Sequence, residues 1–322
     1  MNQQWALEDL RKLYFLPLME LVSQAHTVHL RYHTLGEIQI CYLISVKTGG
    51  CPEDCKYCAQ SARYQTPTKA EPFLKYETVM EMAKQAAKKG VTRVCLGAAW
   101  KEVRDNHYFN EVLRMIKGIT SLGVEVCCTL GKLKPEHAEK LKEAGLYAYN
   151  HNLDTSREYY KTIITTRTYD ERLKTLDIVE EENLSVCCGG IIGIGETAED
   201  RLGLLWTLAQ RERPPESIPI NFLEPIPGTP LADQPKLPFW EMLRMIALTR
   251  IVFPKAMVRL SGGRIRMGQE EQLLCFFAGA NSIFSGEKLL TVPGPSFEND
   301  RSLFQVCGLT PRPAFLKPRG CS

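Results

Sequence analysis

The sequence predicts an α/β fold, a (β/α)8 TIM-type barrel with an N-terminal helical extension and an irregular C-terminal tail. Eight short runs rich in β-branched and other apolar residues follow one another along the chain. Amphipathic helical windows separate most of these runs, which is the alternation expected of parallel βα units. The chain has 322 residues and is 44% hydrophobic, so it can bury one large core. An open doubly wound sheet is the alternative, but such a sheet normally contains fewer strands.

The predicted elements can be placed by residue range. Residues 1–37 form the helical extension, residues 38–290 the barrel, and residues 291–322 a tail in which repeated prolines interrupt the helical period. The eight predicted strands cover residues 40–48, 92–99, 124–131, 148–154, 184–194, 218–224, 257–263 and 280–286. Apolar residues at helical spacing predict helices over 77–90 and 110–123, and a glycine in the C-cap position ends each of them.

The predicted strands share a common phase. Side chains alternate between the two faces of a strand, and in six of these strands an apolar face opposes a face of polar side chains and thiols. The polar faces carry Arg93, Cys95, Glu125, Cys127, Thr129, Asn150, Asn152, Asp154, Ser185, Cys187, Asn221, Arg259 and Ser261. If helices cover the apolar faces, these groups point into the barrel. Burying them unpaired would cost about 1–3 kcal/mol each, so we expect a ligand or cofactor inside. The alternative is that the phase is reversed or that the strand assignments are shifted by one residue.

Composition excludes several classes of function. The 40 basic and 37 acidic residues give a net charge of +3 without a long basic run, which argues against nucleic acid as the main partner. No apolar run reaches transmembrane length, and the first residues lack a signal or transit peptide pattern, so we expect a cytoplasmic protein without a membrane partner. The 12 cysteines are too few for a disulfide scaffold and many for an ordinary cytosolic enzyme, which favours metal or redox chemistry.

A short loop, "GGCPEDCKYCAQSARY", contains Cys51, Cys55 and Cys58 directly after the first predicted strand. Barrel enzymes place their active-site loops at this end of the strands. Thiolates are soft ligands that suit zinc or iron–sulfur clusters. A structural zinc site needs a fourth ligand, and residues 59–69 contain neither cysteine nor histidine. Three thiolates can instead hold three irons of a 4Fe-4S cluster and leave the fourth iron open. A zinc site and a fortuitous pattern are the alternatives.

This spacing, with Tyr57 just before the last cysteine, resembles the signature of the radical S-adenosylmethionine superfamily. Further segments narrow the resemblance, among them "CLGAAW", "YNHNLDTS", "IITTRTY", "GGIIGIGET", "PINFL", "GTPLAD", "VRLSGGR" and "AGANSIF". Together these segments resemble the biotin synthase family over about residues 38 to 290, which is the whole predicted barrel.

The resemblance implies two clusters and one organic cofactor. In the family, a loop matching Cys51, Cys55 and Cys58 holds a 4Fe-4S cluster. The positions that match the ligands of a second cluster, a 2Fe-2S cluster inside the barrel, are Cys95, Cys127, Cys187 and Arg259. The positions that match S-adenosylmethionine-binding residues are Tyr57, Gly97, Ala98, Ala99, Asn152, Asp154, Arg172 and Ile194. Gly97 to Ala99 and the segment around Ile194 would contact the cofactor through their backbone.

The residues themselves support only part of this second ligand set. They predict Cys95, Cys127 and Cys187 as a convergent thiol site, although a single inward cysteine is more often a small buried hydrophobe. They do not predict Arg259 as a ligand, because a guanidinium is always protonated and has no acceptor atom. Its expected role is hydrogen bonding or charge balance, and ligation is implied by the resemblance alone.

The remaining cysteines leave two questions open. Cys128 and Cys188 directly follow two of the proposed ligands, so the choice of ligand is ambiguous by one residue in each doublet. No role is assigned to four others, which are Cys41, Cys275, Cys307 and Cys321.

The inward asparagines suit a particular kind of substrate. A cyclic urea presents one carbonyl and two N–H groups, and the amides of Asn150, Asn152 and Asn221 can both donate and accept. In the family this substrate is dethiobiotin. Asp154 suits a ribose diol, and the alternative is that these residues only cap turns. Arg172 either lies near the cofactor, as the resemblance implies, or is an exposed charge on a helix face.

The resemblance implies radical insertion of sulfur into dethiobiotin to form biotin. S-adenosylmethionine would be cleaved with one electron from an external reductant of the flavodoxin or ferredoxin type, and a sulfide of the 2Fe-2S cluster would be inserted. Members of the family are usually homodimers. Two other functions stay open: a related radical enzyme with another small substrate, and a cluster carrier without catalysis. The carrier predicts metal binding without cofactor cleavage.

Overall fold

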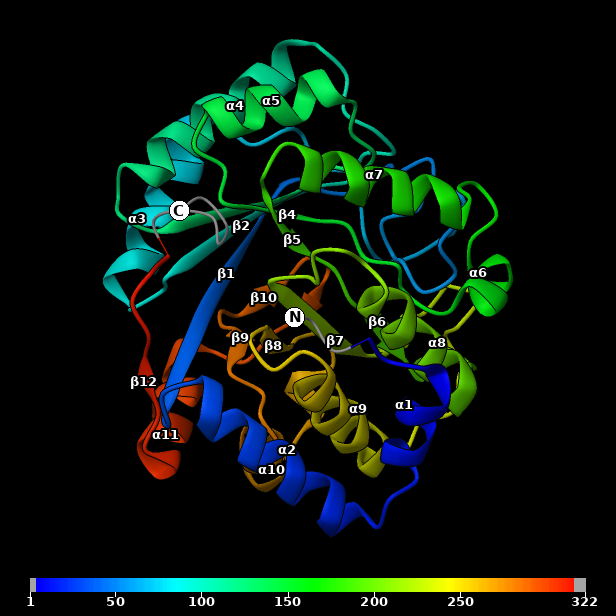
Figure 1. The fold of residues 1–322 in the computed structure, drawn as a ribbon. Coiled ribbons are helices and arrows are strands. Elements are labelled where there is room, and N and C mark those ends of the chain that lie inside the picture. The colour runs from blue at the N-terminus through cyan, green and yellow to red at the C-terminus, as the bar shows by residue number, and fades with distance from the viewer. Residues whose placement is uncertain (1–3, 316–322) are drawn as a thin grey trace.

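Eight parallel strands close into a barrel in this computed structural model, which describes residues 4–315 (Figure 1). The barrel strands, in order around the barrel, are β1 (Glu37–Lys47), β2 (Arg93–Ala98), β3 (Glu125–Thr129), β4 (Ala148–Asn150), β5 (Ser185–Cys187), β7 (Ser217–Phe222), β8 (Met257–Leu260) and β9 (Ser282–Phe284). Pairing between β1 and β9 closes the circle, and the short β6 (Gly190–Ile192) also pairs with β7. The predicted barrel and all eight strand positions are confirmed, and the doubly wound alternative is wrong.

Helices surround these strands. They are α3 (Tyr76–Lys88), α4 (His107–Thr120), α5 (Pro135–Glu143), α6 (Arg157–Ile163), α7 (Tyr169–Glu181), α8 (Ala198–Ala209), α9 (Phe239–Val252), the 3-10 turn η1 (Arg264–Arg266) and α10 (Gln269–Phe277). Polar caps define several N-termini; for example, the Asn106 side chain accepts from the Phe109 N–H at 3.0 Å, and Thr168 forms a capping box with Glu171. The two helices predicted from periodicity correspond to α3 and α4.

Helices at the N-terminus continue the outer layer. These are α1 (Leu7–Tyr14) and α2 (Leu18–Tyr32), drawn in blue in Figure 1, where α2 lies along α9. Among residues 4–315, no helix is long and apolar enough to span a bilayer.

The C-terminal region is more regular than the irregular tail that the sequence predicts. It contains a hairpin of β10 (Lys288–Leu289) and β11 (Val292–Pro293), then α11 (Phe297–Cys307) and β12 (Thr310–Pro311). Ser296 caps α11, and Gly308 ends it in the left-handed conformation with φ 66°. The prolines thus precede and follow a helix rather than exclude one. Residues 316–322, including Cys321, lie outside the described residues.

Two separate buried layers confirm the predicted phase of the strands. The main core lies between strands and helices and includes Val126, Cys128, Val186 and Cys188. A second cluster inside the barrel groups Cys41, Cys95, Cys127, Tyr147, Ala148 and Cys187, with Leu43, Phe284 and Phe315 packed against it. The apolar faces therefore meet the helices, and the thiol faces point inward.

A buried charge network closes the N-terminal end of the barrel. Arg93 forms ion pairs with Glu125 at 2.6 Å and with Glu216 at 3.1 Å. Arg312, which follows β12, pairs with Glu125 at 3.2 Å, and Phe315 stacks on Tyr147. Mutual pairing compensates the cost of burying these charges. The chain after α11 therefore helps to seal the barrel below its thiols.

Candidate cluster and cofactor site

The three-cysteine loop, Cys51, Cys55 and Cys58, follows β1 at the C-terminal end of the barrel. Its backbone is fixed by its own hydrogen bonds: the Cys51 N–H donates to Gln60 O at 2.9 Å, and the Cys58 N–H donates to Cys55 O at 2.9 Å. All three thiols are half-buried. The loop therefore presents three preorganised soft donors at the mouth of the barrel.

Asp54 fastens this loop to the segment between α6 and α7. Its Oδ1 accepts from the backbone N–H groups of Thr165 at 2.9 Å and Thr166 at 3.1 Å. Burial raises the pKa of this carboxyl, but the hydrogen bonds from the two threonines outweigh burial and lower the pKa to about 2. The carboxylate therefore stays charged and holds the loop in place across the physiological range.

The donor set of the loop fits an iron–sulfur cluster. Burial raises the pKa values of all three thiols, that of Cys58 to about 11, so each thiol needs a cation before it becomes a thiolate. Within residues 4–315, no three His, Cys, Asp or Glu side chains converge closely enough to hold one metal ion. A multi-iron cluster distributes its thiolates over several irons and requires no such convergence.

A buried ion pair lies against the loop. Asp154 Oδ2 accepts from the Tyr57 hydroxyl at 2.8 Å and pairs with Arg172 Nη2 at 2.8 Å. Asp154 is 2% exposed and Arg172 6% exposed, so the alternative that Arg172 is an exposed charge on a helix face is wrong. Asp154 also has a φ of 68°, which aspartate tolerates better than most residues. Burial raises the pKa of Asp154, and the positive charge of Arg172 opposes that rise.

We expect Arg172→Ala to destabilise the protein by about 3–5 kcal/mol, because it leaves the Asp154 carboxylate buried and unpaired. The free energy of unfolding in urea measures this cost. The matched control is Arg157→Ala, which removes an exposed pair with Asp170 and should cost no more than about 1 kcal/mol. Equal costs for the two variants would contradict the view that the Asp154–Arg172 pair is a buried unit.

The barrel thiol set, defined as Cys95, Cys127 and Cys187, lies deeper than the loop and on three strands. Cys95 and Cys127 are register partners on β2 and β3. Cys187 on β5 accepts from Asn150 Nδ2 at 3.2 Å and from Arg259 Nη1 at 3.5 Å. The structure therefore brings together all four residues that the sequence matched to a second cluster.

The barrel interior favours a thiolate at Cys187, which suits a soft metal-containing group. A hydrogen bond from Cys127, together with the nearby Arg259 charge, lowers the pKa of Cys187 against the effect of burial. The interior also contains buried polar atoms that have no partner among the described residues: Arg93 Nη1, Tyr147 Oη, Ser185 Oγ and Ser217 Oγ. These atoms lie at the closed end of the barrel, so the fit to a bound cluster depends instead on the three soft thiols gathered inside it.

Hydrogen bonds hold the three asparagines in place at the mouth of the barrel. Asn152 Oδ1 accepts from Asn150 Nδ2 at 3.0 Å and from the Gly189 N–H at 3.1 Å. Asn221 donates to Gly190 O and accepts from the Gly262 N–H, both at 3.0 Å. Each amide thus keeps part of its hydrogen-bonding capacity while the backbone fixes its orientation.

The remaining positions matched to the cofactor are Gly97, Ala98, Ala99 and Ile194, which lie at the end of β2 and in the main core. Gly97 and Ala98 end β2, and Ala99 follows them; a Cβ on Gly97 would lie 3.4 Å from Leu290 Cδ2 in the β10–β11 hairpin. The Ile194 side chain lies in the main core, and its carbonyl accepts from the Tyr159 hydroxyl at 3.2 Å. The free protein therefore already uses one backbone group of Ile194.

Sequence reasoning left Cys41 without a role, and the structure places it inside the barrel with the thiol set. The strand phase contained the signal that could have found it. Ile40 and Ile44 of the same strand lie in the main core, on the face that meets the helices. Cys41 is adjacent to Ile40, so its side chain points to the opposite face, into the barrel.

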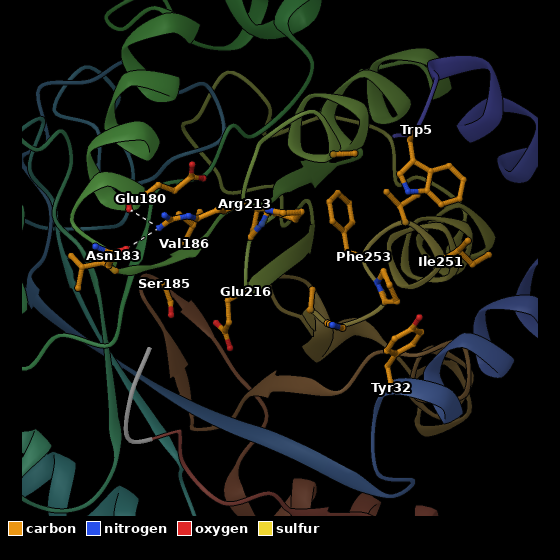
Figure 2. A pocket seen from close by; sticks show the side chains of 18 residues that line it. Trp5, Tyr32, Glu180, Asn183, Ser185, Val186, Arg213, Glu216, Ile251 and Phe253 are labelled. Carbon is orange, nitrogen blue, oxygen red and sulfur yellow. Dashed lines mark hydrogen bonds between the residues drawn. The ribbon is translucent and has the colours of Figure 1, made fainter. Parts of the chain in front are cut away.

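A sizeable cavity lies away from this chemistry. It measures about 740 Å³ and is lined by Ser185, Glu216 and Ala256, at or just before the starts of β5, β7 and β8. Figure 2 shows Arg213 at its wall, where the guanidinium donates to Glu180 O and to Asn183 Oδ1. The cavity opens at the N-terminal end of the strands, opposite the three-cysteine loop, so it is not the reaction site.

Comparison with known proteins agrees with this geometry. Residues 45–205 match the model of the radical SAM superfamily, and residues 219–310 match the Biotin and Thiamin Synthesis associated domain. The barrel and its three-cysteine loop therefore define a radical S-adenosylmethionine enzyme, which carries an iron–sulfur cluster and uses S-adenosylmethionine. The chain belongs to the biotin synthase family and is a sulfurtransferase of this superfamily.

The relatives that support this assignment align along nearly the whole chain. Biotin synthase of Chlamydia abortus is 59% identical over 319 residues, covering 99% of this chain and 96% of the relative. Mitochondrial biotin synthase of Arabidopsis thaliana is 52% identical over 313 residues, covering 97% and 83%.

Solved structures support the fold alone. Methylornithine synthase superposes with a TM-score of 0.80 at 20% identity, covering 96% of this chain and 95% of the other. The FeFe-hydrogenase maturase HydG from Carboxydothermus hydrogenoformans gives a TM-score of 0.82 at 17% identity, covering 98% and 77%.

Proposed function

We propose that the chain inserts sulfur into dethiobiotin to form biotin. In this proposal Cys51, Cys55 and Cys58 hold a 4Fe-4S cluster at which S-adenosylmethionine is cleaved, and the barrel thiol set with Arg259 holds a 2Fe-2S cluster. The observation that carries the proposal is the second group of inward thiols, buried in the barrel and separate from the loop. A radical enzyme that only cleaves or rearranges its substrate has no need of a second sulfur source.

Alternate residues after β4 link the two thiol groups. Asn150 contacts Cys187, Asn152 contacts Asn150, and Asp154 contacts Tyr57 on the loop. An extended chain rises about 3.3 Å per residue, so this ladder spans roughly 13 Å between the groups. That length suits a small substrate held between a cofactor at the mouth and a sulfur donor below.

The residues of the chain have distinct tasks in this proposal. When bound, the clusters and the cofactor supply the electron transfer, the radical and the inserted sulfide. Asp154 and its partners orient the ribose of the cofactor, and Asn150, Asn152 and Asn221 bind the ureido ring of dethiobiotin through their amides. The buried charges around Arg93 and the C-terminal segment exclude water from below. Arg259 donates to Cys187 Sγ in the free protein and would take the fourth position at the 2Fe-2S cluster, as the family resemblance implies.

The family resemblance supports three further parts of the proposal. They are an external one-electron reductant of the flavodoxin or ferredoxin type, a homodimer and a cytoplasmic location. The positions Gly97, Ala98, Ala99 and Ile194 are proposed to contact the cofactor through their backbone.

Anaerobic purification with iron and sulfide counts tests the proposal. We expect iron and acid-labile sulfide for one 4Fe-4S and one 2Fe-2S cluster per chain, and biotin when reductant, S-adenosylmethionine and dethiobiotin are added. Cofactor cleavage that never yields biotin would favour a radical enzyme with another substrate. Metal binding without cofactor cleavage would favour a cluster carrier.

We expect Asn152→Ala and Asn221→Ala to uncouple the reaction. Each variant removes amide contacts to the ureido ring, and a buried hydrogen bond to a neutral group is worth about 1 kcal/mol, with a further penalty for any partner left unpaired. Biotin formation should fall about tenfold or more, while 5′-deoxyadenosine is still released. Quantifying both products measures the uncoupling. The exposed Asn299 on α11 provides the control, and an Asn299→Ala variant with the same uncoupling would contradict the assignment.

A further inference from the structure

Cys41 is a fourth thiol inside the barrel. It lies on β1, has no exposed surface, and belongs to the same buried cluster as the barrel thiol set. Cys275 is equally buried but lies in the main core between strands and helices. The two residues therefore differ in surroundings and not in exposure.

Cys41 and Arg259 share two polar partners inside the barrel. Cys41 Sγ lies 3.6 Å from Gln39 Oε1 and 3.7 Å from Ser282 Oγ. Arg259 donates to the same two oxygens, to Ser282 Oγ from Nε at 2.9 Å and to Gln39 Oε1 from Nη2 at 3.1 Å. Strand β9, which carries Ser282, lies between β8 and β1, so the thiol and the guanidinium flank one serine. Both side chains are therefore within reach of the same side of the interior.

The chemistry of the two groups differs. A protonated guanidinium offers only donors, and all three nitrogens of Arg259 already donate, including Nη1 to Cys187. A thiolate is anionic and soft, which is the preferred ligand type for iron in a cluster. A small buried cysteine normally packs against apolar atoms. Cys41 instead contacts an amide oxygen and a hydroxyl, in a buried cluster that contains three other thiols.

We propose that Cys41 is a reserve thiolate ligand of the 2Fe-2S cluster proposed for the barrel, called the auxiliary cluster below. Cys41 would take the coordination position that the family resemblance gives to Arg259. This inference rests on the proposed function, because it requires a cluster in the barrel. In the exchange, the bond between iron and the arginine nitrogen breaks and a bond between iron and Cys41 Sγ forms. The thiol proton passes to the released guanidine nitrogen through Ser282 or Gln39. Charge and electron count are unchanged.

The test compares the amount of iron bound in the auxiliary cluster, called auxiliary iron, among variants that lack Arg259. In a Cys55→Ala background, which removes the loop cluster, we would count iron and sulfide and record Mössbauer spectra for three proteins. These are Arg259→Ala, Arg259→Ala with Cys41→Ser, and Arg259→Ala with Cys275→Ser. Serine keeps the size of Cys41 and its contacts to Gln39 and Ser282. Circular dichroism checks folding, and Arg259→Lys replaces Arg259→Ala if the alanine variants do not fold.

We expect the Arg259→Ala protein to keep most of its 2Fe-2S cluster, with iron parameters of all-thiolate ligation. Adding Cys41→Ser should lower auxiliary iron at least severalfold, and adding Cys275→Ser should not. Equal auxiliary iron with and without Cys41→Ser would overturn the inference, as would full loss of the cluster in Arg259→Ala alone. A chain with Arg259 and Cys41 intact that holds no auxiliary cluster would instead overturn the proposed function, so the two failures are distinguishable.

Discussion

Cys127→Ala and Cys187→Ala should abolish biotin formation, whereas Cys128→Ala and Cys188→Ala should leave it largely intact. Adjacent residues on a strand face opposite sides, and the structure places the first of each doublet in the barrel cluster and the second in the main core. Loss of a residue that hydrogen-bonds to a metal ligand typically costs about 10–100-fold in metal affinity or activity. Loss of the ligand itself should therefore cost more. The core variants should lose about 1 kcal/mol of stability.

Three measurements separate the members of each doublet: the 2Fe-2S absorption, the biotin yield, and the midpoint of thermal unfolding. The inward variants should still cleave S-adenosylmethionine, because the three-cysteine loop is a separate donor set. The opposite pattern, with Cys128 and Cys188 essential and their neighbours dispensable, would leave the proposed second cluster without structural support.

Cys51→Ala, Cys55→Ala and Cys58→Ala should each abolish cleavage of S-adenosylmethionine. A 4Fe-4S cluster that has lost one of its three protein ligands is expected to be lost or unable to bind the cofactor. Release of methionine and 5′-deoxyadenosine under reducing conditions measures this cleavage, which should fall by more than about a hundredfold. The spectrum of the auxiliary cluster should persist in all three variants.

Cys307→Ala is the matched control for the loop, because Cys307 is also half-buried but ends α11, outside both thiol groups. It should cleave the cofactor at the normal rate. Cleavage that survives in all three loop variants would contradict radical chemistry at this loop. Zinc without acid-labile sulfide in the purified protein would contradict it as well.

The barrel and its thiols could be predicted because they depend on local periodicity. The alternation of apolar and polar side chains sets the inward face of each strand, and the same rule distinguishes Cys127 from Cys128. The three-cysteine loop could be predicted because its spacing is local in the sequence. The same alternation applied to β1 would also have placed Cys41 inside the barrel.

Other features could not be predicted because they depend on partners distant in the sequence. Arg172 looks like a helix-face charge until its pairing with Asp154 is known. The ion pairs of Arg93 with Glu125 and Glu216 join three strands at the closed end of the barrel. The C-terminal segment adopts a regular structure because β12 pairs with β1. The prolines in this segment do not predict that pairing.

An isotope measurement tests whether the inserted sulfur comes from the 2Fe-2S cluster proposed for the barrel. The clusters are rebuilt with 34S-sulfide, free sulfide is removed, and one turnover with dethiobiotin is followed by mass spectrometry of the product. We expect biotin that carries the label, at no more than about one equivalent per chain, and no biotin from Cys127→Ala protein whose loop cluster is labelled. Unlabelled biotin from the intact protein, or labelled biotin from the Cys127→Ala protein, would contradict it.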